Sequence, residues 1–584
     1  MSEHELNEEE FSFKSYFIPL TTLKAINWIV IIGLIVFANM LFNGFVWDDK
    51  TYIILNQQVH SFDLARLIGN SLFNSGGNYR PIPALYFTTL YSLFRDYAFF
   101  YHFIQLIFHT INTVLLYLVF KKFFKNTTAF FLSLIFLIHP IQVESVSYIA
   151  STTSTIFFQF GILAVLFLMQ KKESIQKIII IFTLLLLSLF TKETGFLFLI
   201  VVLLYKILFN RENVKKYLLA SVCIFVIYLI FRFFIGDVYV TKLTLIPIDR
   251  LTLIQRISNI PAIILYYLKT LLFPYNFVID QQWVVTTIDF STFYFPLLID
   301  LSFLLLLAVI GTYLFKRKKS SYKIFLFFVF WFCVGMFLHL QILPLDLTVA
   351  DRWFYFPFVG LLGIIGTITH MVKINNKYLV RIGYSLLIIV LVFLSIRTIM
   401  RNQNWKDAIT LYTHDIKIYD NFDIENNLSL EYANISQYQN ALIHAHKSVT
   451  LFPNEINIDN IGYIYLKEGS FEKAQYYYSK AYYYKHYLPI LQKHTVNTYL
   501  GLGASLMYLN NLESANKFLE EGTKEYSDDD RLWEMLAISE YKSHNTDIAI
   551  GAIRKAMIIS PGAQTDYIYE SIINNFPINI NLTF

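Results

Sequence analysis

The sequence has few charged residues and almost no cysteine. Charged side chains make up 15% of its 584 residues, whereas 56% are hydrophobic and 18% aromatic. A soluble multidomain enzyme carries about 25% charged residues, so that class of protein is excluded. Cys223 and Cys333 are the two cysteines, and both lie inside apolar runs, which excludes a disulfide scaffold. The net charge of +5 gives no support for nucleic-acid binding.

Long apolar runs are what the sequence has instead. A bilayer crossing needs roughly 17 to 25 apolar residues of helix. On that criterion, runs before residue 400 predict about eleven transmembrane helices in a polytopic bundle. The runs are 26–42, 101–120, 127–138, 156–169, 178–190, 196–209, 217–235, 293–315, 324–343, 354–370 and 378–396. Proline and lysine interrupt a further segment, 257–273, which we interpret as an interfacial or re-entrant helix.

Lysine and arginine gather in alternate loops between these runs, as in 121–125 and 316–319. Short basic loops stay on the cytoplasmic side of a membrane. This predicts a multi-pass protein of the cytoplasmic membrane, with a cytoplasmic N-terminal tail at 1–22 and a transmembrane domain at 23–400. The N-terminal residues lack the pattern of a cleavable signal peptide. The long first loop, 46–98, is predicted to be extracytoplasmic and to carry a surface helix near residues 63–68.

The last part of the chain, 401–584, is polar and repetitive. Alanine recurs in a shared frame at intervals of 33, 41 and 34 residues, at Ala441, Ala474, Ala515 and Ala549. These intervals are close to the tetratricopeptide (TPR) period of about 34 residues. Glycines in this frame, Gly462 and Gly503, are predicted where helices pack closely, and Pro453 and Pro561 where second helices end. The sequence therefore predicts an all-α fold, in which a membrane bundle is followed by an extracytoplasmic TPR α-solenoid.

Stacked repeats bury a continuous core and leave a concave groove. The solenoid is therefore predicted to bind a partner rather than to catalyse a reaction. Tyrosines at 476–478 and 482–484 either line that groove or belong to the core. The longest alanine interval predicts an insertion near 484–495.

Adjacent carboxylates follow the first apolar run, at Asp48 and Asp49. Ionisable residues at a membrane are costly and mark candidate sites. Two adjacent acids offer one general base and one group that orients it or a substrate hydroxyl. The alternative is a hydrophilic stop at the interface. Glu144 is a candidate partner carboxylate, whereas His139 is interpreted as a structural cap ahead of Pro140.

Cations accompany these acids. Arg352 has the planar fork that suits a phosphate oxygen, although a lone interfacial arginine also serves as a snorkelling anchor. Lys192 and Glu193 suggest an ion pair that leaves the lysine available to a phosphate. In the predicted topology all these groups fall on the extracytoplasmic side: Asp48, Asp49, Arg80, Glu144, Lys192, Glu193 and Arg352. This pattern predicts one site for chemistry on a lipid-linked phosphate, in which a carboxylate deprotonates an acceptor hydroxyl and cations stabilise the departing phosphate.

Ordered motifs at these positions resemble the glycosyltransferase C superfamily, and within it the multi-span, TPR-containing O-mannosyltransferases. The matching stretches are Phe45–Asp49 with Tyr52 and Asn56, Tyr79–Pro81, His139–Pro140 with Glu144, Lys192–Gly195, Tyr267–Pro274, Asp351–Arg352 with Tyr355 and Pro357, and Arg401 with Trp405. The resemblance covers nearly the whole chain. The sequence departs from the family at Ala150–Thr155, which lacks an Arg and an Asp found there, and at Asp351, where Glu is more usual.

The resemblance implies inverting transfer of a sugar from a polyprenyl-phosphate donor to an extracytoplasmic acceptor, either a protein hydroxyl or a glycan. Asp48 or Asp49 would act as base or acceptor anchor, and Glu144 as the second-loop acid. Arg352 would lie near the lipid phosphate. The remaining substrate-binding residues would be Arg80, Lys192, Glu193 and Tyr355, with the acceptor engaged by the TPR groove. No histidine or cysteine cluster has metal-ligand spacing, so no metal is predicted and metal dependence stays open.

Other functions are compatible with parts of the pattern. A polymerase or ligase of polyprenyl-linked glycans would also use acids and arginines at an outer membrane face. A membrane-anchored TPR scaffold would need no paired carboxylates. A transporter would place charges at mid-span, often in broken helices, whereas the charges here cluster at the ends of the runs.

Overall fold

The computed structural model describes residues 20–69, 78–170, 173–236, 238, 246–371, 375–484 and 494–578. Across these residues the chain is helical, and the β pairing described is an isolated bridge between Gln281 and Val349. The chain forms two compact units, Met1–Leu411 and Tyr412–Phe584. The predicted all-α fold is therefore confirmed. The domain boundary predicted at residue 400 falls inside helix α16 (Lys377–Asn404).

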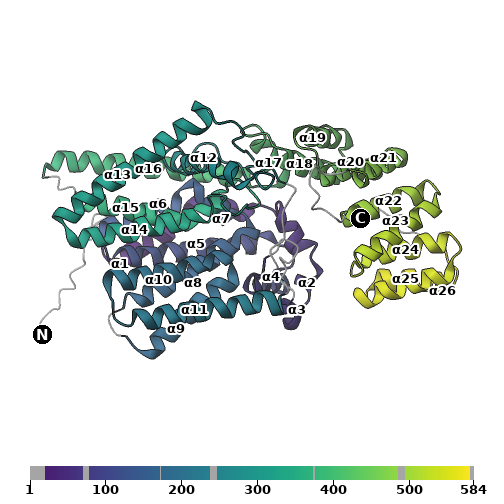
Figure 1. Cartoon of the computed structure of the whole chain (residues 1–584), viewed down its shortest axis with the longest axis horizontal. Helices are drawn as coiled ribbons and strands as arrows, with labels where there is room; N and C mark the ends of the chain where they lie inside the picture. Colours follow the sequence, from purple (N-terminus) through teal and green to yellow (C-terminus); the bar gives the residue numbers. More distant parts are fainter. Residues whose placement is uncertain are drawn as a thin grey trace, which may run out of the picture. The chain divides into compact units, whose positions relative to one another are not determined.

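In the first unit, a helix covers most of each of the eleven apolar runs, and the helices run alongside one another as a bundle (Figure 1). They are α1 (Thr22–Phe37), α5 (Ala98–Phe120), α6 (Asn126–Ile138), α8 (Thr152–Leu168), α9 (Ile175–Thr191), α10 (Phe196–Phe209), α11 (Val214–Ile230), α13 (Phe295–Arg317), α14 (Lys319–Phe337), α15 (Pro357–Met371) and α16. The run at 324–343 is helical only to Phe337. Among the described residues, seven helical segments are long and apolar enough to cross a membrane, or eight when the pair bent by 53° after Ile138 counts as one span. The protein is thus a membrane protein, and the number of eleven crossings stays a prediction.

Short elements connect the helices of this bundle. In the first loop they are the π-helix η3 (Lys50–Ile54), α2 (Gln57–His60), α3 (Leu64–Gly69) and α4 (Pro81–Phe94). Helix α3 confirms the helix predicted near 63–68, and the Tyr79 hydroxyl ties it to α4 by donating to the Ile68 carbonyl at 2.9 Å. Later connectors are η5 (Pro140–Gln142), α7 (Val143–Ser147), η6 (Ile149–Ser151), η7 (Glu193–Gly195), η8 (Phe231–Ile235), η9 (Phe290–Tyr294) and η10 (Asp351–Tyr355).

The segment predicted to be interfacial is helix α12 (Leu253–Leu272). It begins with a capping box, in which Thr252 and Gln255 exchange side-chain and backbone hydrogen bonds, and it contains Pro261. It is not among the helices that are long and apolar enough to cross a membrane within the described part of the chain. Its position in a membrane stays a prediction.

Close packing of α14 on α15 fixes the segment between them. A Cβ added to Gly360 would lie 2.4 Å from the backbone nitrogen of Phe332, so α15 approaches α14 as closely as two backbones allow. The connector η10 enters α15 directly. Segment η10 is therefore attached at its C-terminal end to a closely packed helix pair.

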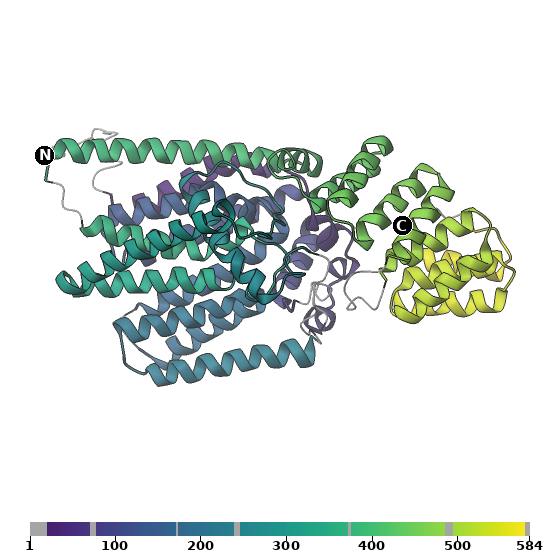
Figure 2. The ribbon, with the colours of Figure 1, turned by 45° about the horizontal axis from the view of Figure 1, so that its top comes forward.

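The second unit is a stack of antiparallel helix pairs, visible from green to yellow in Figure 2. After α17 (Ala408–Asp415), which runs into it, the helices are α18 (Phe422–Asn434), α19 (Tyr438–Leu451), α20 (Glu455–Glu468), α21 (Phe471–Tyr482), α22 (Val496–Tyr508), α23 (Leu512–Glu525), α24 (Asp530–Lys542), α25 (Thr546–Ile559) and α26 (Ala563–Ile573). The alanines that define the frame are fully buried in the second helix of each pair. The predicted TPR-like solenoid is confirmed, and α19 and α25 end shortly before Pro453 and Pro561, as expected.

Tyrosine and glycine pack against each other in this solenoid. A Cβ on Gly462 would lie 2.9 Å from the Tyr478 ring, and one on Gly503 would lie 2.7 Å from Leu519, as the sequence predicted for close helix packing. Tyr478 is 1% exposed and belongs to the core, whereas Tyr476 is 61% exposed. The core interpretation therefore applies to Tyr478, and groove lining by the exposed tyrosines stays a prediction. Most of the predicted insertion, 485–493, lies outside the described residues.

Candidate active site at one end of the helix bundle

Asp48 and Asp49 lie in different environments. Asp49 is fully buried, and its two carboxylate oxygens accept backbone N–H groups from Val46 at 3.1 Å and from Ala150 at 2.6 Å. Asp48 is partly exposed, and its Oδ2 accepts the Tyr148 hydroxyl at 2.6 Å. Asp49 thus fastens the first loop to the second, while Asp48 presents its carboxylate at the surface of that junction.

Burial raises the pKa of the Asp49 carboxyl to about 8. The N–H groups of Val46 and Ala150 oppose this increase, and the charge of Asp48 adds to it.

Trp47, which precedes the two aspartates, has a φ of 51°, a left-handed conformation that a bulky side chain rarely adopts. Its indole stacks on the Tyr148 ring with centroids 5.6 Å apart. Strain of this kind persists when the surroundings enforce it and is common at functional sites.

Glu144 and Arg352 join the second loop to η10. The Glu144 side chain is 3% exposed, forms an ion pair with the Arg352 guanidinium and accepts the Arg352 backbone N–H at 3.0 Å. Asp346 lies 3.7 Å from the same guanidinium. Although burial alone would lower it, these two carboxylates hold the pKa of Arg352 above its ordinary value. The guanidinium also lies over the Trp47 ring, 5.7 Å from its centroid, so Arg352 is fixed beside the aspartates.

Glu193 pairs with arginines rather than with Lys192. Arg80, which precedes α4, donates from Nε and Nη2 to Glu193 Oε2 at 3.1 and 2.8 Å. Arg232 in η8 lies 3.5 Å from Glu193 Oε1. The predicted ion pair between Lys192 and Glu193 is therefore wrong. Lys192 is in extended backbone, and consecutive side chains of extended backbone point to opposite sides.

Lys192 is left with a neutral partner. Its Nζ donates to Ser154 Oγ at 3.0 Å, and among the described residues no carboxylate lies within ion-pair distance of it. Burial, followed by the neighbouring charges of Arg80 and Arg352, lowers the pKa of Lys192 to about 7. An ammonium group in such surroundings gains from any anion that enters.

Four cations gather in this part of the site. They are Arg80, Lys192, Arg232 and Arg352, and the carboxylates of the described residues within ion-pair distance of them include Glu144, Glu193 and Asp346. Tyr52 lies within electrostatic range of Asp48 on one side and of Arg80 and Arg352 on the other. The cluster and the aspartates thus lie close enough together to affect one another's charge.

Tyr355 does not join the other predicted site residues. It is 1% exposed, and its hydroxyl is 2.9 Å from His109 Nδ1 and 3.1 Å from Asn112 Nδ2, inside the bundle. Rings of Phe136 and Phe158 pack around it. Its contacts tie η10 to α5, which is a positioning role. His139 acts as the cap predicted from the sequence, since its Nδ1 accepts the Ile141 N–H at 3.2 Å.

A buried polar stripe on α5 supports the site and was missed from the sequence. Its members, His102, Gln105, His109 and Asn112, are fully buried. Gln105 Nε2 donates to the Tyr148 carbonyl at 3.0 Å, which holds the segment that carries the Asp48 partner. The spacing of three and four residues is helical, so this signal was present in the sequence.

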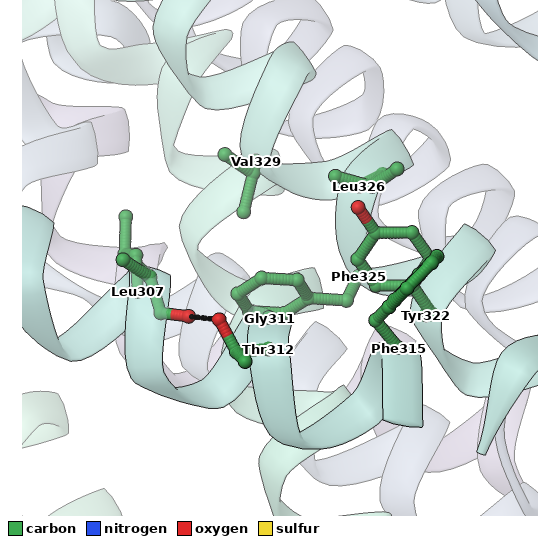
Figure 3. A pocket seen from close by; sticks show the side chains of 9 residues that line it. Leu307, Gly311, Thr312, Phe315, Tyr322, Phe325, Leu326 and Val329 are labelled. Atoms are coloured by element: carbon green, nitrogen blue, oxygen red, sulfur yellow. Dashed lines mark hydrogen bonds between the residues drawn. The ribbon is translucent and has the colours of Figure 1, made fainter. Parts of the chain in front are cut away.

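A cavity of about 440 Å³ lies elsewhere, between α13 and α14 (Figure 3). Side chains such as Leu307, Phe325 and Val329 line it, and no carboxylate, amine or guanidinium does. It offers no group for acid–base chemistry. Within the described ranges no three His, Cys, Asp or Glu side chains are grouped to hold a metal.

Comparison with known proteins confirms the resemblance that the motifs indicated. No family model matches the chain. It is 24% identical over 503 residues to protein O-mannosyl-transferase TMTC3 of Homo sapiens, covering 79% of this chain and 55% of that protein. It is 22% identical over 412 residues to protein O-mannosyl-transferase F38B6.6 of Caenorhabditis elegans, covering 67% of this chain and 57% of that protein. The chain thus spans about half the length of these curated relatives.

Among solved structures, the crystal structure of the APC/C hetero-tetramer Cut9-Hcn1 matches 89% of this chain and 94% of its own at 12% identity. The TM-score is 0.26, too low to carry a structural argument. The sequence comparisons stand by themselves: the chain is similar to proteins named as protein O-mannosyl-transferases.

Proposed function

We propose that the protein is a membrane glycosyltransferase that moves a sugar from a polyprenyl-phosphate donor to an acceptor hydroxyl, with inversion at the anomeric carbon. The observation that carries the proposal is Lys192, a mostly buried ammonium beside Arg80 and Arg352 that has no carboxylate partner among the described residues. Such a cluster favours an anion. Similarity to named O-mannosyl-transferases supports the same class of enzyme and makes mannose the first sugar to test.

The cations favour an anionic donor. Glu144, Glu193 and Asp346 pair with arginines, whereas Lys192 donates to the neutral Ser154. A sugar phosphate would therefore gain an ammonium partner. A ligase or polymerase that uses diphosphate-linked glycans would need the same kind of cations, and the choice of donor in the transfer assay separates the two functions.

Asp48 is the proposed base. It is partly exposed and held by Tyr148, whereas both oxygens of the buried Asp49 already accept backbone N–H groups. Asp48 takes the proton of the acceptor hydroxyl as the oxygen attacks the anomeric carbon. The bond between that carbon and the phosphate oxygen breaks, and polyprenyl phosphate leaves with both electrons. Because the phosphate gains negative charge in this step, cations fixed around it stabilise the transition state more than the bound donor.

Glu144 acts through Arg352 rather than on substrate. Its carboxylate binds both the guanidinium and the backbone N–H of Arg352, which fixes the direction of the arginine fork. Glu193 fixes Arg80 in the same way. The TPR-like unit is proposed to engage the acceptor, either a protein or a glycan.

Sugar transfer by the purified full chain tests the proposal. The assay uses radiolabelled mannosyl-phosphoryl-polyprenol and a library of hydroxyl-bearing peptides. Asp48→Asn is expected to lower transfer by roughly 10²- to 10⁴-fold, the usual loss of a general base, with an unchanged thermal midpoint. Asp49→Asn is the matched control: it places an amide against two backbone N–H groups and should mainly lower the midpoint. Full transfer by Asp48→Asn would eliminate the proposed base.

A further inference from the structure

His339 lies just beyond the end of α14, in a loop whose residues hydrogen-bond to one another. Gln341, two residues later, has a φ of 59° and donates from Nε2 to the carbonyls of Leu347 at 2.6 Å and Thr348 at 2.9 Å. Its Oε1 accepts the Leu345 N–H at 3.0 Å. One amide side chain therefore holds together the loop that links α14 to η10.

The imidazole of His339 is stacked on Trp353, the residue after Arg352. The ring centroids are 5.0 Å apart and the planes differ by 11°. The side chain is 6% exposed, and its Nδ1 is buried with no hydrogen-bond partner among the described residues. A buried polar atom without a partner is costly, so a ligand that supplies one gains affinity.

Burial, helped by nearby cations, keeps His339 neutral. Burial, then the charges of Lys192 and of Arg352, lower its pKa to about 3. A neutral imidazole carries one N–H and adds no positive charge to the cluster. With so low a pKa it holds a proton too weakly to act as the general base at neutral pH. As a neutral group, His339 can still donate one hydrogen bond to an anion that Lys192 and Arg352 attract.

We propose that His339 is a phosphate-binding residue, which donates a hydrogen bond from Nδ1 to a non-bridging oxygen of the donor phosphate. This inference rests on the proposed function, because it assumes that the anion is the donor phosphate. Lys192 supplies most of the attraction and Arg352 a guanidinium fixed by Glu144, whereas His339 adds a neutral donor. A third donor restricts how the phosphate can turn in the site.

Binding of methyl farnesyl phosphate tests this role. The probe is a phosphodiester with one negative charge and no sugar, and its affinity for the detergent-solubilised full chain is measured by isothermal titration. His339→Asn keeps an N–H near the position of Nδ1, whereas His339→Gln reaches the position of Nε2. His339→Phe keeps the ring on Trp353 and removes both nitrogens.

His339→Phe and His339→Gln are expected to weaken binding by roughly ten- to a hundred-fold, the loss of one hydrogen bond to a charged group, whereas His339→Asn should retain most of the affinity. The thermal midpoint of each variant reports folding. Equal affinities of the Asn and Gln variants, or wild-type affinity in the Phe variant, overturn the role of His339. Arg352→Gln separates the two proposals: if it too binds like wild type, the phosphate site and the proposed function fail together.

Discussion

Lys192 should make the binding of the donor phosphate depend on pH. Its pKa is lowered to about 7 by burial and by Arg80 and Arg352. A phosphate bound about 4 Å away would stabilise the ammonium by about 4 kcal/mol at an effective dielectric constant near 20. This corresponds to about 3 pKa units, which raises the pKa of Lys192 in the complex to about 10. Between about pH 7 and pH 10, binding of the anion is therefore coupled to the uptake of one proton.

The direction of this pH dependence follows from the protonation state of Lys192 that binds the phosphate. Below the pKa of the free site, Lys192 is already charged, and affinity does not change with pH. Above it, each complex must take up a proton, so affinity falls by roughly ten-fold per pH unit until the pKa of the complex is reached. Between pH 6 and pH 9 the total loss should be about a hundred-fold.

The assay is titration with methyl farnesyl phosphate, whose single charge does not change over this range. Lys192→Arg is the matched control, because a guanidinium stays charged throughout. Arg80, Arg352, Glu193, Asp346 and His339 also face Lys192 and are the same in both proteins. Asp49, whose pKa burial raises to about 8, lies in the same site and is also unchanged, so the part of the wild-type slope that exceeds the slope of Lys192→Arg reports Lys192. A flat wild-type profile, or an equal slope in Lys192→Arg, would refute the coupling.

Two other predictions concern positioning and packing. Tyr148→Phe removes the hydrogen bond to Asp48 and should lower kcat for sugar transfer by roughly ten-fold or more, with little change in the thermal midpoint; a kcat equal to that of wild type would contradict the role of Tyr148. Gly360→Ala forces a Cβ to 2.4 Å from the Phe332 nitrogen and should cost about 1 to 3 kcal/mol of stability, as overpacking does. Gly383→Ala, where no atom lies within 4 Å of the added Cβ, should keep or slightly raise the wild-type midpoint, because alanine favours a helix more than glycine does. Equal midpoints in both variants would show that α14 and α15 separate freely.

The fold could be predicted from the sequence because its signals are local. Apolar runs long enough for helices, and alanines at the TPR interval, need no knowledge of distant contacts. The alanines lie fully buried where the repeat frame places them. The count of crossings is less local: runs such as Asn126–Ile138 are shorter than a typical span and depend on bends and neighbouring helices.

The site could be predicted only in part, because its roles depend on pairs distant in sequence. The adjacency of Asp48 and Asp49 is visible in the sequence. The sequence does not show that the buried Asp49 accepts the backbone N–H of Ala150, far along the chain. The adjacency of Lys192 and Glu193 also suggested an ion pair between them, whereas Glu193 accepts hydrogen bonds from Arg80. His339 belongs to no motif, and its place beside the cations follows from the loop that closes around Gln341.

The arginines and the lysine have different roles, because among the described residues the arginines pair with carboxylates and Lys192 does not. A carboxylate that binds an arginine fixes its direction but cancels most of its charge, as Glu144 does for Arg352 and Glu193 for Arg80. These arginines can orient a phosphate precisely while adding little net attraction. Lys192 has no such partner among the described residues, so the attraction comes mainly from it. Because the departing phosphate gains charge during transfer, Lys192 should lower the barrier of the chemical step in addition to strengthening binding of the donor.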